Sequence, residues 1–136
     1  MAYVRENKEN LQKLLQRIGN VAYSMTSQDW SKMVIGYFLE GPEQITHLQI
    51  QMGTLSGDYV DIQEKAWECG DYDDAILDMG DLCRELHQLC AAAGDDWNTM
   101  TYRLNQDGSF EVEYSYDPID DYDGEFILDW QSRYLD

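Results

Sequence analysis

The chain has 136 residues, of which 43% are hydrophobic and 12% aromatic, and its 27 acidic and 9 basic side chains give a net charge of −18. This length suits one domain spanning residues 1–136, and the apolar content is enough for a buried core, which excludes a disordered chain. The negative charge disfavours binding to nucleic acid or to an anionic membrane, and no apolar run is long enough to span a bilayer.

The N-terminal part of the chain predicts a helix followed by strands. Apolar residues recur at helical spacing over residues 3–25, which predicts a helix with one buried side. Residues 30–40 form a nearly continuous apolar run, as in a buried strand, and a turn follows. Residues 48–52 alternate between apolar and polar side chains, which predicts a half-exposed strand, and residues 59–62 predict a short third strand.

The C-terminal part predicts two helices separated by a hairpin. Residues 71–93 carry one apolar face, begin with acids that suit the helix dipole and are followed by glycine, so they predict a long helix. Residues 99–104 and 110–116 alternate around a turn and predict a β-hairpin. An acidic loop at 117–124 then leads to a last helix at 125–135. The expected fold is α+β, an antiparallel sheet with helices packed on one face.

The net charge is confined to one part of the chain. Residues 1–56 hold five acids and five bases, whereas residues 57–136 hold 22 acids and four bases, so the later segment carries the whole net charge. At 100° per residue, five acids of the long predicted helix fall within an arc of about 80° beside its apolar face. These acids are Asp71, Asp74, Asp78, Asp81 and Glu85. Such like charges repel by roughly 0.2–0.5 kcal/mol per pair, so we interpret them as an anionic binding surface, with a solvated helix face as the alternative.

The acidic loop is the second candidate binding region. It contains Asp117, Asp120, Asp121, Tyr122 and Asp123. It does not fit a calcium-binding EF-hand, because aligning its glycine with the glycine of that motif places apolar residues at the first and twelfth ligand positions. We expect these carboxylates to pair with arginines of a basic partner, with Tyr122 as an aromatic anchor. The alternative is an acidic loop that only caps the last helix.

Cysteine and histidine residues indicate neither a metal site nor a catalytic site. Cys83, His87 and Cys90 share one side of the long predicted helix, but their spacing is not that of a zinc finger, and both cysteines fit the apolar stripe. We therefore expect Cys83 and Cys90 to be buried free thiols without a metal, as in a reducing cytoplasm. His47 is expected to be a half-exposed structural residue. The sequence has no phosphate-binding loop or hydrolase motif, so we expect no enzymatic activity and no cofactor.

The C-terminal third resembles a known family. Residues 97–104 begin with Trp-Asn-Thr, residues 108–117 hold a Gly-x-Phe hairpin, and Trp130 is followed by Tyr-Leu at 134–135. This run is similar to the end of the YezG-like immunity (antitoxin) proteins of bacteria, whose order of elements also fits residues 1–96. The aromatic side chains of the run are interpreted as the core of the hairpin and its covering helix, not as a site. They are Trp97, Phe110, Tyr114, Tyr116, Trp130 and Tyr134.

The resemblance implies a cytoplasmic inhibitor of a toxin that a neighbouring cell delivers, as in contact-dependent inhibition, or that is encoded beside it. The toxins of this family are often the C-terminal domains of large polymorphic secreted proteins, and commonly nucleases. Because a nuclease binds phosphate, its cleft is usually basic, and an acidic protein can occupy that cleft stoichiometrically. Two alternatives use the same carboxylates: an acidic mimic of nucleic acid that regulates a host nucleic-acid-binding protein, and a metal-dependent enzyme.

Overall fold

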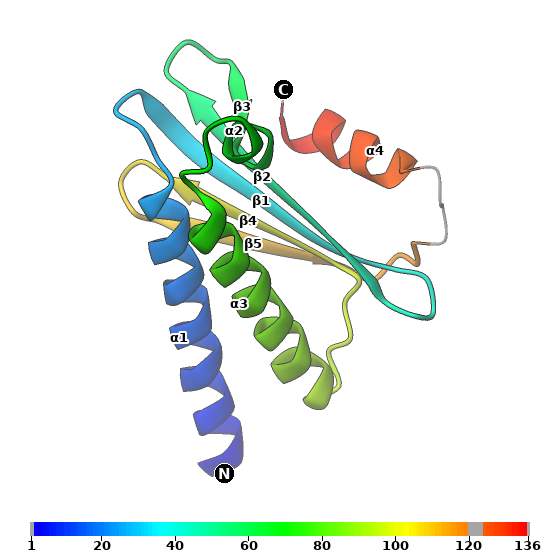
Figure 1. Ribbon diagram of the computed structural model, residues 1–136. Coiled ribbons are helices and arrows are strands. Elements are labelled where there is room, and N and C mark those ends of the chain that lie inside the picture. Colours follow the sequence, from blue (N-terminus) through cyan, green and yellow to red (C-terminus); the bar gives the residue numbers. More distant parts are fainter. Residues whose placement is uncertain (1, 120–123, 136) are drawn as a thin grey trace.

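The computed structural model describes residues 2–119 and 124–135, with side chains from residue 8 onward, as four helices around a five-stranded antiparallel sheet (Figure 1). In chain order the elements are α1 (Ala2–Ser24), β1 (Trp30–Glu40), β2 (Ile45–Thr54), β3 (Tyr59–Asp61), α2 (Ile62–Cys69), α3 (Asp73–Ala92), β4 (Thr99–Asn105), β5 (Phe110–Ser115) and α4 (Glu125–Tyr134). The predicted α+β class with an antiparallel sheet is confirmed.

The sheet is built around β1, which pairs with β2 on one side and with β4 on the other, in the strand order β3-β2-β1-β4-β5. Met33 of β1 lies opposite Met52 of β2 and Leu104 of β4 in the two ladders. Every residue from 33 to 40 is buried, because β1 is central and is covered on both faces. This explains why its sequence is a continuous apolar run and not an alternating one.

The helices α1 and α3 cover one face of the sheet and build the main core (Figure 1). Ile18 of α1, Leu86 of α3 and Ile35 of β1 are fully buried in one cluster. The Tyr102 hydroxyl of β4 donates a 2.9 Å hydrogen bond to the Leu15 carbonyl of α1, which ties the helix to the sheet. The predicted one-sided burial of both helices is thereby confirmed. No helix within the described residues is long and apolar enough to cross a membrane.

The helix α4 lies on the opposite face of the sheet (Figure 1). Val34 and Phe38, which alternate along β1 with residues of the main core, form a second buried cluster with Trp130 of α4. The Trp130 indole donates a 2.9 Å hydrogen bond to Thr101 Oγ1 and lies so close to Gly36 that a Cβ there would be 2.7 Å from the ring. This placement differs from the expected packing of all helices on one face, because both sides of β1 are apolar and both need cover.

The C-terminal aromatic residues therefore divide between two cores. Trp97 stacks on Tyr114 at a centroid distance of 5.4 Å in the cluster that contains α1 and α3, whereas Trp130 and Tyr134 belong to the α4 face. Tyr116, which the sequence places in the core, is instead 55% exposed. The reason is that β5 ends at Ser115, so the inward and outward alternation of the strand does not extend to residue 116.

Between β3 and α3 the chain forms α2, where the sequence pattern indicates only a short strand. The Asp61 side chain accepts a 3.1 Å hydrogen bond from the Glu64 backbone N–H and so caps the start of α2. Gly70 ends α2 in a left-handed conformation with φ of 73°, and α3 begins at Asp73. Asp71 therefore lies in the turn between the two helices and not on the long helix, in contrast to the prediction.

Candidate partner-binding surface

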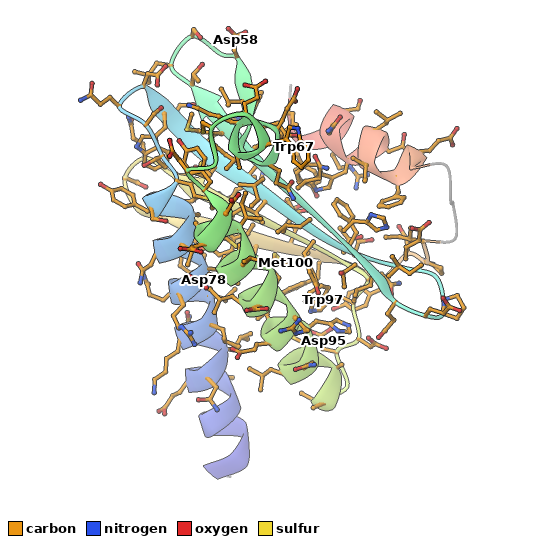
Figure 2. All side chains as sticks on the ribbon, in the orientation of Figure 1. Asp58, Trp67, Asp78, Asp95, Trp97 and Met100 are labelled. Carbon is orange, nitrogen blue, oxygen red and sulfur yellow. The ribbon has the colours of Figure 1, made fainter. Side chains whose placement is uncertain are left out.

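Four exposed aspartates lie on the outer side of α3 and in the turn before it. We call Asp71, Asp74, Asp78 and Asp81 the α3 acidic face. The other side of α3 is buried against the core, and Figure 2 shows Asp78 on the part of α3 that lies beside α1. The helical spacing that predicted a common side for the acids of α3 is therefore consistent with the structure, and none of these side chains belongs to the core.

Among the described residues, ion pairs balance the charges around the α3 acidic face only at its C-terminal end. Asp81 forms an ion pair with Arg84, at 2.8 Å between Oδ1 and Nη2. One turn further along, Glu85 lies 4.0 Å from Arg17 of α1, and Arg17 lines a groove of about 420 Å³ between α1 and α3. The first three members of the face make no ion pair with the described part of the chain. The carboxylates of the face that lack an ion-pair partner in the described part of the chain therefore concentrate where α3 begins.

Asp117, the one candidate of the acidic loop among the described residues, does not lie on the α3 acidic face. Asp117 is exposed just after β5 and lines a groove of about 450 Å³ with Phe38 and Trp130, on the side of the sheet that α4 covers. The remaining candidates of this loop lie outside the described residues; they are Asp120, Asp121, Tyr122 and Asp123. The described acids of the predicted surface therefore lie in two regions on opposite faces of the sheet.

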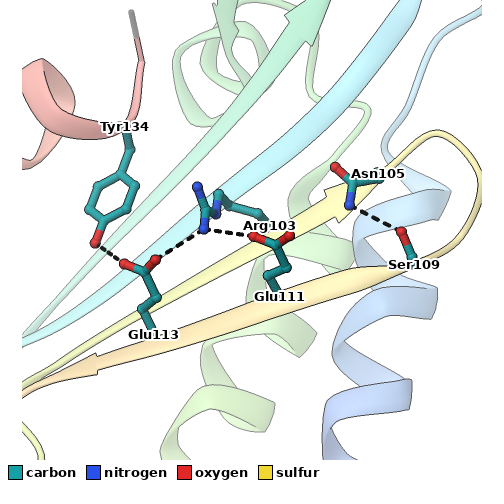
Figure 3. Close-up of polar contacts among 6 residues, drawn as sticks. All are labelled: Arg103, Asn105, Ser109, Glu111, Glu113 and Tyr134. Carbon is teal, nitrogen blue, oxygen red and sulfur yellow. Dashed lines mark hydrogen bonds and ion pairs between the residues drawn. The ribbon is translucent and has the colours of Figure 1, made fainter.

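The glutamates of β5 belong to a polar network that joins the hairpin to α4 (Figure 3). Arg103 Nη2 lies 2.7 Å from a carboxylate oxygen of Glu111 and 3.0 Å from one of Glu113. The Tyr134 hydroxyl donates a hydrogen bond to the other oxygen of Glu113. Burial, and then this hydrogen bond, raise the pKa of Tyr134 above its ordinary value. Glu113 therefore connects Arg103 of β4 to Tyr134 of α4, and Glu111 of β5 pairs with the same guanidinium.

The buried side of α3 holds two cysteines and His87. Cys83 and Cys90 are buried and unbridged, as predicted. Burial raises the pKa of Cys83 to about 12, so its thiol stays protonated and unreactive at neutral pH. His87 Nε2 lies 3.0 Å from Asp96 Oδ1, and its ring packs edge-on against Trp97. Within the described residues, no group of three or more His, Cys, Asp or Glu side chains is placed to hold a metal ion.

A second histidine–carboxylate pair lies beneath α4. His47 Nε2 is 2.7 Å from Glu40 Oε1, and the imidazole packs against the Phe126 ring of α4 with 5.2 Å between centroids. Glu40 is buried, and its other oxygen has no hydrogen-bond partner among the described residues. Sequence reasoning gives Glu40 only as the last residue of the predicted strand and misses this contact, although a carboxylate at the end of a buried strand is a signal for it. His47 is half-buried, as predicted.

Sequence reasoning also misses two exposed apolar side chains, one on α2 and one on α3. Trp67 of α2 is 92% exposed and Leu77 of α3 is 68% exposed. Figure 2 shows Trp67 at the end of the molecule where α3 begins. Tryptophan and leucine are usually buried, so residue type does not predict that these two are exposed. The one signal in the sequence is the acidic residues that neighbour them.

The comparisons with known proteins extend the resemblance seen in the C-terminal third. No curated protein matches the chain. A family model does match it, over residues 11–135, and is described as "Immunity protein YezG-like". The matched segment runs from within α1 to the end of α4 and contains β1 through β5. The match therefore covers both faces of the sheet and nearly the whole chain.

Proposed function

Because this chain belongs to the YezG-like immunity protein family, we propose that it neutralises a nuclease toxin by binding it stoichiometrically through an acidic surface. Membership of this family supports an immunity-protein role and implies a cognate toxin as the binding partner. Immunity protein families are generally non-enzymatic, so we assign the chain no catalytic step and no cofactor. The proposal adds the nuclease chemistry of the toxin, the surface that binds it, and the cytoplasm as the place of inhibition.

The observation that carries this proposal is the uncompensated charge of the α3 acidic face. Asp71, Asp74 and Asp78 are exposed and lack an ion-pair partner within the described part of the chain. Charge of one sign held this densely destabilises a folded protein by self-repulsion, so a compensating role in binding is the simplest explanation. A nuclease binds phosphate through basic side chains, and these provide the complementary surface.

Opposite charges also suit the timing of immunity. Electrostatic steering can raise the association rate of two proteins toward roughly 10⁸–10⁹ M⁻¹s⁻¹ at low salt. A toxin that is already folded acts until it is bound, so fast association limits the damage. In the complex, carboxylates that meet arginines can form bidentate pairs, which slow dissociation.

The acidic loop provides an accessory contact in this proposal. Its candidate residues are Asp117, Asp120, Asp121, Tyr122 and Asp123. Because Asp117 lies on the α4 side of the sheet, a toxin that touches both regions must reach around the sheet edge. We therefore assign the main contact to the α3 acidic face.

A titration of the toxin with the purified chain tests the proposed function. The toxin domain is taken from the gene beside the one that encodes this chain, and its nuclease activity is measured against increasing amounts of the chain. We expect activity to fall linearly to zero at about one equivalent, as for tight one-to-one binding. We also expect the chain alone to cleave no nucleic acid with or without Mg²⁺ or Zn²⁺. A toxin that stays fully active in excess chain would overturn the proposal, and complete inhibition at a small fraction of an equivalent would indicate catalysis instead.

A further inference from the structure

Trp67 differs from the other tryptophans of the chain in its exposure. Trp30, Trp97 and Trp130 are at most 8% exposed, whereas Trp67 is 92% exposed. A buried aromatic side chain removes roughly 150–250 Å² from water and is a major source of stability. A tryptophan left in solvent contributes none of this to the fold, so its position calls for another explanation.

The geometry of α2 shows that Trp67 is not needed to hold this helix. Ile62 and Ala66, one turn apart, are the buried residues of α2. At 100° per residue, Trp67 lies about 140° around the helix from Ile62. Asp61 caps the start of α2, and the Gly70 N–H donates a 2.6 Å hydrogen bond to the Ala66 carbonyl at its end. The helix α2 is therefore short and capped at both ends, and its Trp67 side chain extends into solvent.

Acids predominate among the charged residues of the segment that contains α2. Between residues 58 and 78 the chain holds eight acids and a single base. That base is Lys65, whose ammonium lies 6.0 Å from the centre of the Tyr72 ring. Glu64 and Glu68 flank Trp67 in α2 and are both exposed. An apolar centre with a polar rim is the arrangement found where binding energy concentrates in protein interfaces.

The same arrangement continues onto α3. Leu77 is 68% exposed, and Asp73, Asp74 and Asp81 occupy the helical positions three or four residues away from it, where side chains are neighbours. Figure 2 shows that Trp67 and Asp78 lie on these two consecutive helices. The apolar residues of α2 and α3 are therefore both bordered by acids.

We propose that Trp67 is the anchor of the toxin interface and that its indole enters a recess in the basic surface of the toxin domain. This inference rests on the proposed function and names the residue that contributes most to its affinity. The charge around Trp67 favours this partner: a second copy of the chain would bring like charges together, and an anionic membrane would be repelled. A basic surface pairs with Glu64 and Glu68, and an arginine can stack on the indole.

Affinity measurements on matched variants test the anchor. The probe is the purified toxin domain that the wild-type chain inhibits, and the variants are Trp67→Ala, Trp67→Phe and Leu128→Ala. Leu128 of α4 is 64% exposed and controls for the loss of an exposed apolar side chain on the other face of the sheet. We expect Trp67→Ala to raise the Kd at least about 30-fold, mainly through faster dissociation, Trp67→Phe by a smaller factor, and Leu128→Ala by less than about twofold. All three variants should keep the wild-type melting temperature.

A spectroscopic readout shows whether the indole itself is buried in the complex. The chain labelled with 5-fluorotryptophan has four fluorinated residues, and Trp67→Phe identifies the ¹⁹F resonance of residue 67. When unlabelled toxin domain is added, we expect this resonance to shift and to lose its H₂O/D₂O isotope effect, because solvent leaves the ring. The resonances of the buried Trp30 and Trp97 should change little.

The possible outcomes separate the two proposals. If the wild-type chain inhibits the toxin while Trp67→Ala binds within about twofold of it and the ¹⁹F resonance is unchanged, the anchor is wrong and the proposed function stands. If the wild-type chain does not bind the toxin, both fail. If the wild-type chain self-associates and Trp67→Ala abolishes this, the patch belongs to a second copy of the chain, and the anchor is again overturned.

Discussion

Two sets of acidic side chains, one on each side of the sheet, have different surroundings. On the α4 face, Glu111 and Glu113 share Arg103, and Glu40 pairs with His47. On the other face, the first three members of the α3 acidic face make no ion pair with the described residues. The acidic residues that produce the net charge of −18 therefore have two physical roles. Paired acids fasten elements together, whereas unpaired acids remain available to a partner.

Reversing the charge of the α3 acidic face is the strongest test of this contrast. Replacing its four aspartates by lysine should lower the rate of association with the toxin domain about 100-fold at low salt, and should weaken the salt dependence, because steering depends on the charge of the facing surfaces. The variant should be as stable as the wild type or slightly more stable, since self-repulsion is relieved. Stopped-flow association rates at several salt concentrations, together with melting temperatures, check both expectations.

A pair of double variants provides the control for total charge. Asp74→Lys with Asp78→Lys, and Glu125→Lys with Asp129→Lys, each reverse two exposed acids four residues apart on a helix. The α3 double variant should slow association about tenfold and the α4 double variant about twofold or less. Equal slowing would show that only net charge matters. If the fourfold variant protects cells from the toxin as well as the wild type at matched expression, the charge serves only to keep the protein soluble.

Gly36→Ala tests the close packing of α4 against β1. A Cβ at this position would lie 2.7 Å from the Trp130 ring, so α4 must shift, and we expect a loss of about 2 kcal/mol in the free energy of unfolding. Gly80→Ala is the matched control, because a Cβ there meets nothing within 4 Å and alanine favours the helix by about 0.5–1 kcal/mol. Urea unfolding measures both. Similar changes in the two variants would contradict the close contact of α4 with β1.

Much of the fold was predictable because burial imposes periodicity on the sequence. β1 spans the predicted residues 30–40, since a strand covered on both faces must be apolar throughout. α2 was missed because Ile62 and Ala66 alone are buried in it, too few positions to show a helical period. The amphipathic pattern of α4 requires a buried side but does not say which face of the sheet provides it. The only indication in the sequence is β1, where the neighbouring residues Val34 and Ile35 are both apolar. Because they point to opposite faces of the sheet, both faces need a covering helix.

The candidate site was predictable in its chemistry but not in its grouping. Helical spacing alone places Asp74, Asp78 and Asp81 on the outer side of α3, and they are exposed there. Charge in a sequence does not report which face of a sheet an acid occupies, so Asp117 was combined with them although the sheet lies between. Trp67 escaped notice because residue type predicts burial for tryptophan, and only the three-dimensional packing of α2 shows that this one faces solvent.

Arg103→Met tests the role of the paired acids on the α4 face. Arg103 is partly buried and contacts two glutamates at once, so its loss leaves Glu111 and Glu113 facing each other, and we expect a cost of about 1 kcal/mol in stability. Arg84→Met, which breaks the well-exposed pair with Asp81, should change stability by less than about 0.5 kcal/mol. Chemical denaturation at low and high salt measures the difference. Equal effects would show that the Arg103 network does not hold α4.

Tyr134→Phe tests the same network by its pH dependence and should have the smallest effect. Burial and the hydrogen bond to Glu113 raise the pKa of Tyr134 above its ordinary value of 10.0. A group whose pKa is higher in the folded state binds its proton more tightly there, so its contribution is complete below pH 10 and is lost as the pH rises through the folded pKa. At pH 7 we expect Tyr134→Phe to cost about 0.5–1 kcal/mol, and this difference from the wild type should shrink above pH 10. Urea midpoints of both proteins between pH 7 and 11 isolate this residue, because the other buried tyrosines titrate in both, and a difference that stays constant with pH would contradict the assignment.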